Sequence, residues 1–139
     1  MTIKESLMKW LNLYENFEIE DFIETDLVEN SGGYAVSKEP TVNVVNFNDG
    51  TQQRTEYYTF MAKKYTTTET QRRANDEFLE QFQDWIFLKD LNCDYPTFEN
   101  AICDKIGLSS TYYLESNQDK LGIYIFTIEM TYRKEIANG

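Results

Sequence analysis

The stretch from Thr41 to Ile86 constrains the fold most, because it predicts a strand, a tight turn, a long strand and a helix in succession. The first strand, 42–47, ends at Asn48-Asp49-Gly50. Asp-Gly is among the strongest short signals for a type I′ hairpin turn, whose two central residues need positive φ. Gly50 is expected to supply that conformation. The return strand is predicted over Thr51–Lys64, because Thr, Tyr and Phe suit a pleated surface.

A long helix is predicted next, over 69–88. Thr66 with Glu69 and Thr68 with Gln71 both have capping-box spacing, so two starts are open. A 3.6-residue apolar stripe is expected to face the core, with Trp85 as a core residue and Gln83 off the stripe. The stripe consists of Ala74, Phe78, Phe82, Trp85 and Ile86, and Phe87, Leu88 and Leu91 widen it at the C-terminal end.

The N-terminal third predicts a first helix over Thr2–Phe17, with an apolar stripe for the core or for a docking partner. That stripe is formed by Ile3, Leu7, Trp10, Leu11 and Tyr14. The acidic segment Glu18–Asn30 follows, with a short strand expected around Phe22–Val28. Its carboxylates suit either a solvated face or a metal-binding loop, but their spacing matches no calcium-loop pattern, which favours the solvated face.

The other elements are short strands and a second hairpin. A strand is expected over Tyr34–Ser37 and should end at Pro40, since proline removes a ladder hydrogen bond. A turn of helix is expected from Thr97, and the second hairpin should turn at Ser116-Asn117-Gln118-Asp119. The order of helix, strands, helix, strands predicts one α+β domain over residues 1–139, with an antiparallel or mixed sheet and two main helices on one face.

The residue types that carry most enzyme chemistry are missing. The chain has no histidine and two cysteines, Cys93 and Cys103, and it contains no glycine-rich nucleotide loop. We therefore predict no catalytic residue, no metal site, no cofactor and no enzyme activity. A net charge of −11 argues against general nucleic-acid binding. With no secretory signal and no apolar run of about 20 residues, folding in a reducing cytoplasm is expected.

The long return strand predicts a self-association surface. Its alternation places Tyr58 and Phe60 on one face and Tyr57 and Met61 on the other. A sheet covered by helices on one side should be polar on its outer side, so the second apolar pair indicates a contact with another copy. The predicted contact residues are Tyr57, Met61, Asn48 and Asp49. A head-to-tail contact whose rotation closes gives a ring.

Four pieces of sequence, in this order and spacing, resemble a known family. They are the N-terminal helix with Trp10-Leu11, the run Gly33-Tyr34-Ala35-Val36-Ser37 followed by Pro40, the hairpin from Phe47 through Lys63 leading to Arg72-Arg73-Ala74-Asn75 and Leu79, and Tyr124-Ile125-Phe126-Thr127-Ile128. The chain is similar to the small minor capsid proteins of tailed phages that belong to the tail-terminator, or head–tail joining, group.

The resemblance implies a structural protein of the virion, assembled in the host bacterial cytoplasm. It implies a ring of identical copies, a hexamer in this family, that contacts the tail tube and head-connector proteins while DNA passes through. It brings no catalytic motif. The alternative from the residues alone is a small acidic binding or regulatory module, for example a DNA-mimicking inhibitor.

Overall fold

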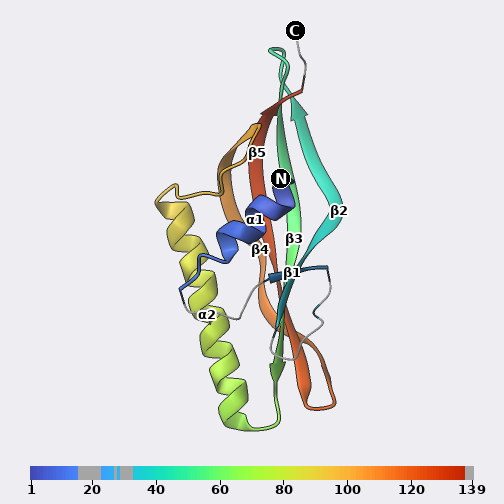
Figure 1. Cartoon of the computed structure of the whole chain (residues 1–139), viewed down its shortest axis with the longest axis vertical. Coiled ribbons are helices and arrows are strands. Elements are labelled where there is room, and N and C mark those ends of the chain that lie inside the picture. The colour runs from blue at the N-terminus through green and yellow to red at the C-terminus, as the bar shows by residue number, and fades with distance from the viewer. Residues whose placement is uncertain (16–22, 27, 29–32, 137–139) are drawn as a thin grey trace.

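The computed structural model describes residues 1–15, 23–26, 28 and 33–136 of the 139-residue chain. Its elements, in chain order, are α1 (Ile3–Leu11), β1 (Ile23–Thr25), β2 (Tyr34–Asn46), β3 (Thr51–Tyr65), α2 (Glu69–Leu91), β4 (Ala101–Gln118) and β5 (Leu121–Glu135). The strands form one sheet in the order β1-β2-β3-β5-β4 (Figure 1). Only β1 and β2 run parallel, and the other pairs are antiparallel. The predicted α+β fold with a mixed sheet is confirmed.

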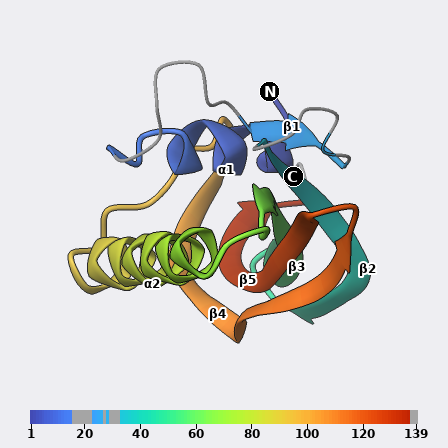
Figure 2. The same ribbon diagram turned by 90° about the horizontal axis from the view of Figure 1, so that it is seen from below.

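A single core lies between the two helices and one face of the sheet. Alternate residues of β3 and β5 point into it, as period-2 strands require, and they are almost completely buried. Figure 2 looks along the long axis and shows α1 and α2 on the same side of the curved sheet. The largest fully buried side chains of the strands are Tyr34, Tyr58, Phe60, Ile106, Phe126, Ile128 and Tyr132, and the helices add Leu7, Leu11, Leu79, Phe82 and Ile86.

Both helices begin with a complete capping box. The Thr2 hydroxyl accepts from the Glu5 N–H, and the Thr68 hydroxyl accepts from the Gln71 N–H, with the reciprocal bonds also formed. Of the two starts predicted for α2, Thr68 is therefore the one used. Thr66 is instead buried, and its hydroxyl donates to Asn117 Oδ1 at 2.6 Å. The first helix ends at Leu11, earlier than the predicted Phe17, which lies outside the described residues.

The side of α2 that faces the core was predicted only partly correctly, because the buried positions are rotated around the helix relative to the predicted stripe. Ala74 is exposed, whereas Leu79 is completely buried, as are the side chains of Phe82 and Ile86. Gln83 was expected to lie off the stripe but is buried, and its Oε1 accepts from the Tyr112 N–H at 2.8 Å. Trp85 is only partly buried and packs on the edge of the core against Trp10, with ring centroids 5.0 Å apart. Phe87, Leu88 and Leu91 are exposed.

The strand predicted to end at Pro40 continues to Asn46. Its pairing with β3 shifts register between Lys38 and Val42, so Pro40 lies in an irregularity where no regular ladder bond is required of it. The strand expected around Phe22–Val28 is the three-residue β1, and Phe22 and Leu27 lie outside the described part of the chain. As a result, β2 is a 13-residue strand of which three residues pair with β1.

The two hairpin turns differ from the predicted ones in position and type. Gly50 has φ 90°, as predicted, but Asp49 does not have positive φ, so the type I′ assignment was wrong there. The Gly50 N–H donates to the Phe47 carbonyl and the Phe47 N–H to the Thr51 carbonyl, which is a longer loop closed by glycine. The second hairpin does not turn at 116–119. Its strands reach Gln118 and Leu121, and the two-residue turn has positive φ at both Asp119 and Lys120.

The edge strand β4 is longer and more irregular than predicted. It begins at Ala101, and no helix forms at the expected position from Thr97. Its pairing with β5 contains four register shifts. At its far end Gly122 of β5 is in tight contact, because a Cβ there would lie 2.8 Å from Leu114 Cδ1 and 2.8 Å from Thr66 Cγ2. The small residue therefore allows close packing.

Candidate interaction surfaces

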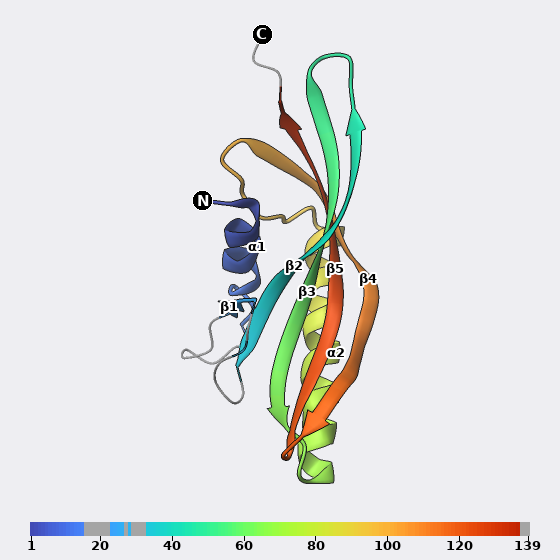
Figure 3. The same cartoon turned by 90° about the vertical axis from the view of Figure 1, so that its right-hand side faces the viewer.

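The end of the β2–β3 hairpin extends beyond both helices along the long axis of the molecule (Figure 3). We call residues 40–56, from Pro40 through the turn to Glu56, the arm. Every residue from 40 to 49 is exposed. Four of these are large and apolar: Val42 and Val44 are 42% exposed, Phe47 is 43% exposed and Val45 is 52% exposed. Exposed apolar residues on both sides of a projecting strand are typical of a contact surface.

The tip of the arm is ordered by Asp49. Its Oδ1 accepts from the Thr51 N–H at 3.0 Å and from the Thr51 hydroxyl at 2.6 Å. These hydrogen bonds hold the pKa of the Asp49 carboxyl below its usual value. The end of β5 pairs along β3 to Thr51, and the Ile136 N–H donates to the Gly50 carbonyl at 3.1 Å. The arm is thus braced by β5 on one edge.

The base of the arm contains a buried carboxylate. Glu56 is 4% exposed, and its two oxygens accept from the hydroxyls of Tyr58 at 2.8 Å and Tyr132 at 3.1 Å. Lys38 Nζ lies 3.4 Å from Glu56 Oε2. Burial is the main cause that raises the pKa of both tyrosines, and hydrogen bonding to Glu56 adds to it, so the hydroxyls remain donors. This network joins β2, β3 and β5 where the arm leaves the core.

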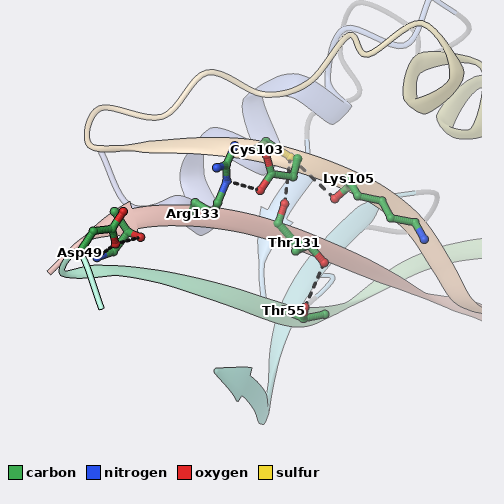
Figure 4. Close-up of polar contacts among 8 residues, drawn as sticks. Asp49, Thr55, Cys103, Lys105, Thr131 and Arg133 are labelled. Carbon is green, nitrogen blue, oxygen red and sulfur yellow. Dashed lines mark hydrogen bonds and ion pairs between the residues drawn. The ribbon is translucent and has the colours of Figure 1, made fainter. Parts of the chain in front are cut away.

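The face of the sheet opposite the helices carries the other predicted residues. Tyr57 and Met61 are partly buried on this open face, and Asn43 Nδ2 donates to the Tyr57 hydroxyl at 3.1 Å. Hydroxyl and charged pairs occur toward the arm. The hydroxyls of Thr55 and Thr131 lie 3.0 Å apart, and Arg133 Nε donates to Asp104 Oδ2 at 2.8 Å (Figure 4). The open face is therefore mixed, with polar pairs near the arm and apolar side chains farther along.

The structure separates the four predicted contact residues into two groups. Tyr57 and Met61 share the open face, four residues or about 13 Å apart along β3. Asn48 and Asp49 lie exposed at the tip of the arm, beyond the strand segment Thr51–Tyr57, which is about 20 Å long. The sequence-based prediction missed the exposed apolar residues of the arm. The available signal was the run Thr41–Phe47, which has high β-propensity and no charged residue.

Charge is distributed unequally along the sequence. Residues 31–68 and 101–139, which contain β2 to β5 and their turns, include eight basic and eight acidic residues. The rest of the sequence, which contains both helices, includes five basic and sixteen acidic residues. The net charge of −11 therefore resides outside the sequence segments that contain the four long strands.

The two thiols differ in environment. Burial raises the pKa of the Cys103 thiol to about 12, and its Sγ donates to the Thr131 carbonyl at 3.7 Å, so it is not a nucleophile at neutral pH. Cys93 is exposed. Within residues 1–15, 23–26, 28 and 33–136, no group of acidic residues or cysteines is arranged to hold a metal ion.

A groove of about 630 Å³ lies beside the C-terminal half of α2, lined by Tyr14, Trp85, Leu88 and Lys89 among others. The Lys89 ammonium lies 5.4 Å from the Trp85 ring centre and pairs with Asp94 at 2.7 Å, so the cation of the groove is already engaged. In the part of the chain that the structure describes, neither helix is long and apolar enough to cross a membrane. No family model matches the chain, and no curated protein matches its sequence.

Proposed function

We propose that this chain is a structural virion protein of a tailed phage, a tail terminator or head–tail joining protein that acts as an oligomeric ring. The observation that carries the proposal is the arm, with its four exposed apolar side chains beyond the helical layer. Exposed apolar side chains on a strand promote aggregation in water. A protein that nevertheless has such a surface is typically one that functions in an assembly, where the surface is buried. The sequence resemblance given above supplies the kind of assembly.

The charge distribution supports the proposed assembly. Ring contacts through the neutral strands avoid the repulsion that copies with a net charge of −11 otherwise exert on one another. The acidic surplus is then left for surfaces that do not adhere to DNA, which suits a ring through which DNA slides. Tyr57 and Met61 on the open face are the proposed head-to-tail contact, and Asn48 and Asp49 at the tip are the second, lesser contact.

The proposal is tested by inactivating the coding sequence in the genome that carries it. Electron microscopy of the lysate should then show filled heads separate from tails, with tails of uncontrolled length or with unjoined ends. A plasmid copy of the wild-type chain should restore joined particles. Joined, infectious particles without any copy of the chain would refute the virion role.

The head-to-tail contact is tested in the same complementation assay. Tyr57→Glu combined with Met61→Glu should leave the circular dichroism spectrum unchanged but fail to restore joined particles, because two carboxylates oppose the apolar contact. The matched control adds the same charge on the exposed side of α2, as Ala74→Glu with Gln81→Glu, and should complement. Normal complementation by the Tyr57/Met61 variant would show that the contact is elsewhere.

The second candidate is a small acidic binding or regulatory module, such as a DNA-mimicking inhibitor. The observation that favours it is a row of exposed carboxylates along α2, formed by Asp76, Glu77, Glu80 and Asp84. This candidate predicts normal particles after inactivation of the coding sequence. It also predicts that reversing these charges, but not the Tyr57/Met61 change, abolishes function.

A further inference from the structure

The two long edges of the sheet are protected unequally. The β4 edge has four register shifts and is covered by α2, which packs against it. Two β4 backbone groups donate to α2 side chains: the Ile106 N–H to Asp90 Oδ1 at 3.1 Å, and the Tyr112 N–H to Gln83 Oε1 at 2.8 Å. Bulges and a covering helix are standard means of preventing an edge from pairing with another chain.

In the part of the chain that the structure describes, the β2 edge has no such protection along the arm. Among the described residues, β1 pairs only with Tyr34, Ala35 and Val36, so β2 beyond Lys38 has β3 on one side and solvent on the other. Thr41–Phe47 has no charge, no proline and no glycine, and it is rich in β-branched residues. That composition is the signature of a segment that pairs readily with further strands.

The hairpin geometry identifies which backbone groups are available. The Phe47 N–H donates across the hairpin to Thr51. Because alternate residues of an antiparallel pair face the partner strand, Asn43 and Val45 also direct their backbone groups toward β3. The backbone N–H and C=O groups of Val42, Val44 and Asn46 therefore point away from the sheet, in a row at the free edge.

We propose that the free β2 edge of the arm pairs, antiparallel, with the same edge of a second copy of this chain about a two-fold axis. An antiparallel edge is complementary to itself, so a symmetric contact needs no second kind of surface. At the β4 edge, α2 side chains already accept from the Ile106 and Tyr112 N–H groups, which disfavours a sheet that continues from β2 of one copy to β4 of the next. The uncharged edge also lets two acidic chains approach closely. The inference rests on this edge and not on the proposed virion role.

Sedimentation velocity of the full chain over a wide concentration range measures the pairing. A reversible species of twice the 16.4 kDa chain mass is expected. Val44→Pro removes the outward N–H of each copy, and proline is tolerated on an edge strand when its nitrogen faces outward. It should weaken dimerisation by roughly tenfold or more, because two intermolecular hydrogen bonds are lost. The matched control, Val44→Thr, keeps the N–H and the β-propensity and should dimerise like the wild type.

Hydrogen exchange on the wild-type chain gives a second measurement that does not depend on a variant folding. The amides of Val42, Val44 and Asn46 should exchange more slowly as the dimer forms, whereas those of Val45 and Phe47 should stay protected at every concentration. A chain that is monomeric throughout would overturn the proposal, as would a dimer in which the outward amides exchange freely. A Val44→Pro chain that folds and dimerises normally would also overturn it. None of these results affects the particle assay, so the two proposals fail separately.

Discussion

The buried Glu56 network at the base of the arm provides a quantitative test of the structure. Glu56→Ala removes the acceptor of two tyrosine hydroxyls, those of Tyr58 and Tyr132, and each of these residues is 1% exposed. A buried polar group left without its partner costs about 1–3 kcal/mol. The two hydroxyls together therefore predict a loss of about 2–6 kcal/mol in the free energy of unfolding, a large share of the stability of a small domain.

The pairwise interaction is isolated by a double-mutant cycle. Tyr58→Phe in the wild-type chain removes a charge-assisted hydrogen bond and should cost about 1.5–3 kcal/mol. In the Glu56→Ala chain the same change removes a hydroxyl that already lacks its acceptor, so it should cost almost nothing or stabilise. Urea unfolding followed by tryptophan fluorescence measures all four chains, and the coupling energy should be about 1.5 kcal/mol or more.

The neighbouring Tyr57 supplies the control for this cycle. Its hydroxyl bonds to Asn43 on the open face and makes no contact with Glu56 in the described structure, so Tyr57→Phe with Glu56→Ala should be additive within about 0.5 kcal/mol. If the effects of Tyr58→Phe and Glu56→Ala are equally additive, the network described at the base of the arm does not form.

Three further outcomes follow from backbone conformation and burial. Gly50→Val should lower the free energy of unfolding by about 1–2 kcal/mol, because φ is 90° there; an unchanged urea midpoint contradicts the turn. Asp119→Asn with Lys120→Gly should raise it by about 1–2 kcal/mol, because both residues have positive φ in a two-residue hairpin turn; a lower thermal midpoint contradicts the assignment. Iodoacetamide at pH 8 should label the exposed Cys93 and leave Cys103, whose pKa is about 12; mass spectrometry showing equal labelling contradicts that burial.

The sequence was most informative where a local signal and the global fold agree. Thr2 begins its helix as expected, and Thr68 is one of the two starts that the spacing allowed for the second helix. The alternation around Tyr58 and Phe60 correctly separated the core face from the open face of β3. Helix capping and strand alternation depend on residues only a few positions apart, so both can be predicted without knowing the tertiary contacts.

The predictions that were wrong concern features that tertiary packing determines. Pro40 ends a strand by local rules, but a shift of register lets β2 pass it. The type I′ turn formed at Asp119-Lys120, without glycine, because the pairing of β4 with β5 leaves only two residues there. Leu79 replaced Ala74 on the core face of α2, because the aromatic residues that set the predicted phase lie partly at its edge.

The candidate contact was predicted in part for a similar reason. Tyr57 and Met61 could be placed on the open face from alternation alone. The uncharged run Thr41–Phe47 signals a strand that can pair, but it does not show that Val42 and Val44 are exposed, because nothing local shows where helical cover ends along a strand. That depends on the length of α2 and on where α1 packs, and both are settled only by the assembled core.

The most direct measurement of the central claim is the position of the chain in assembled particles. An affinity tag fused after Gly139 and labelled with gold should mark the head–tail junction, once per particle, in electron micrographs of infectious virions. Label distributed over heads or along tails, or purified particles that contain none of the chain, would contradict the account.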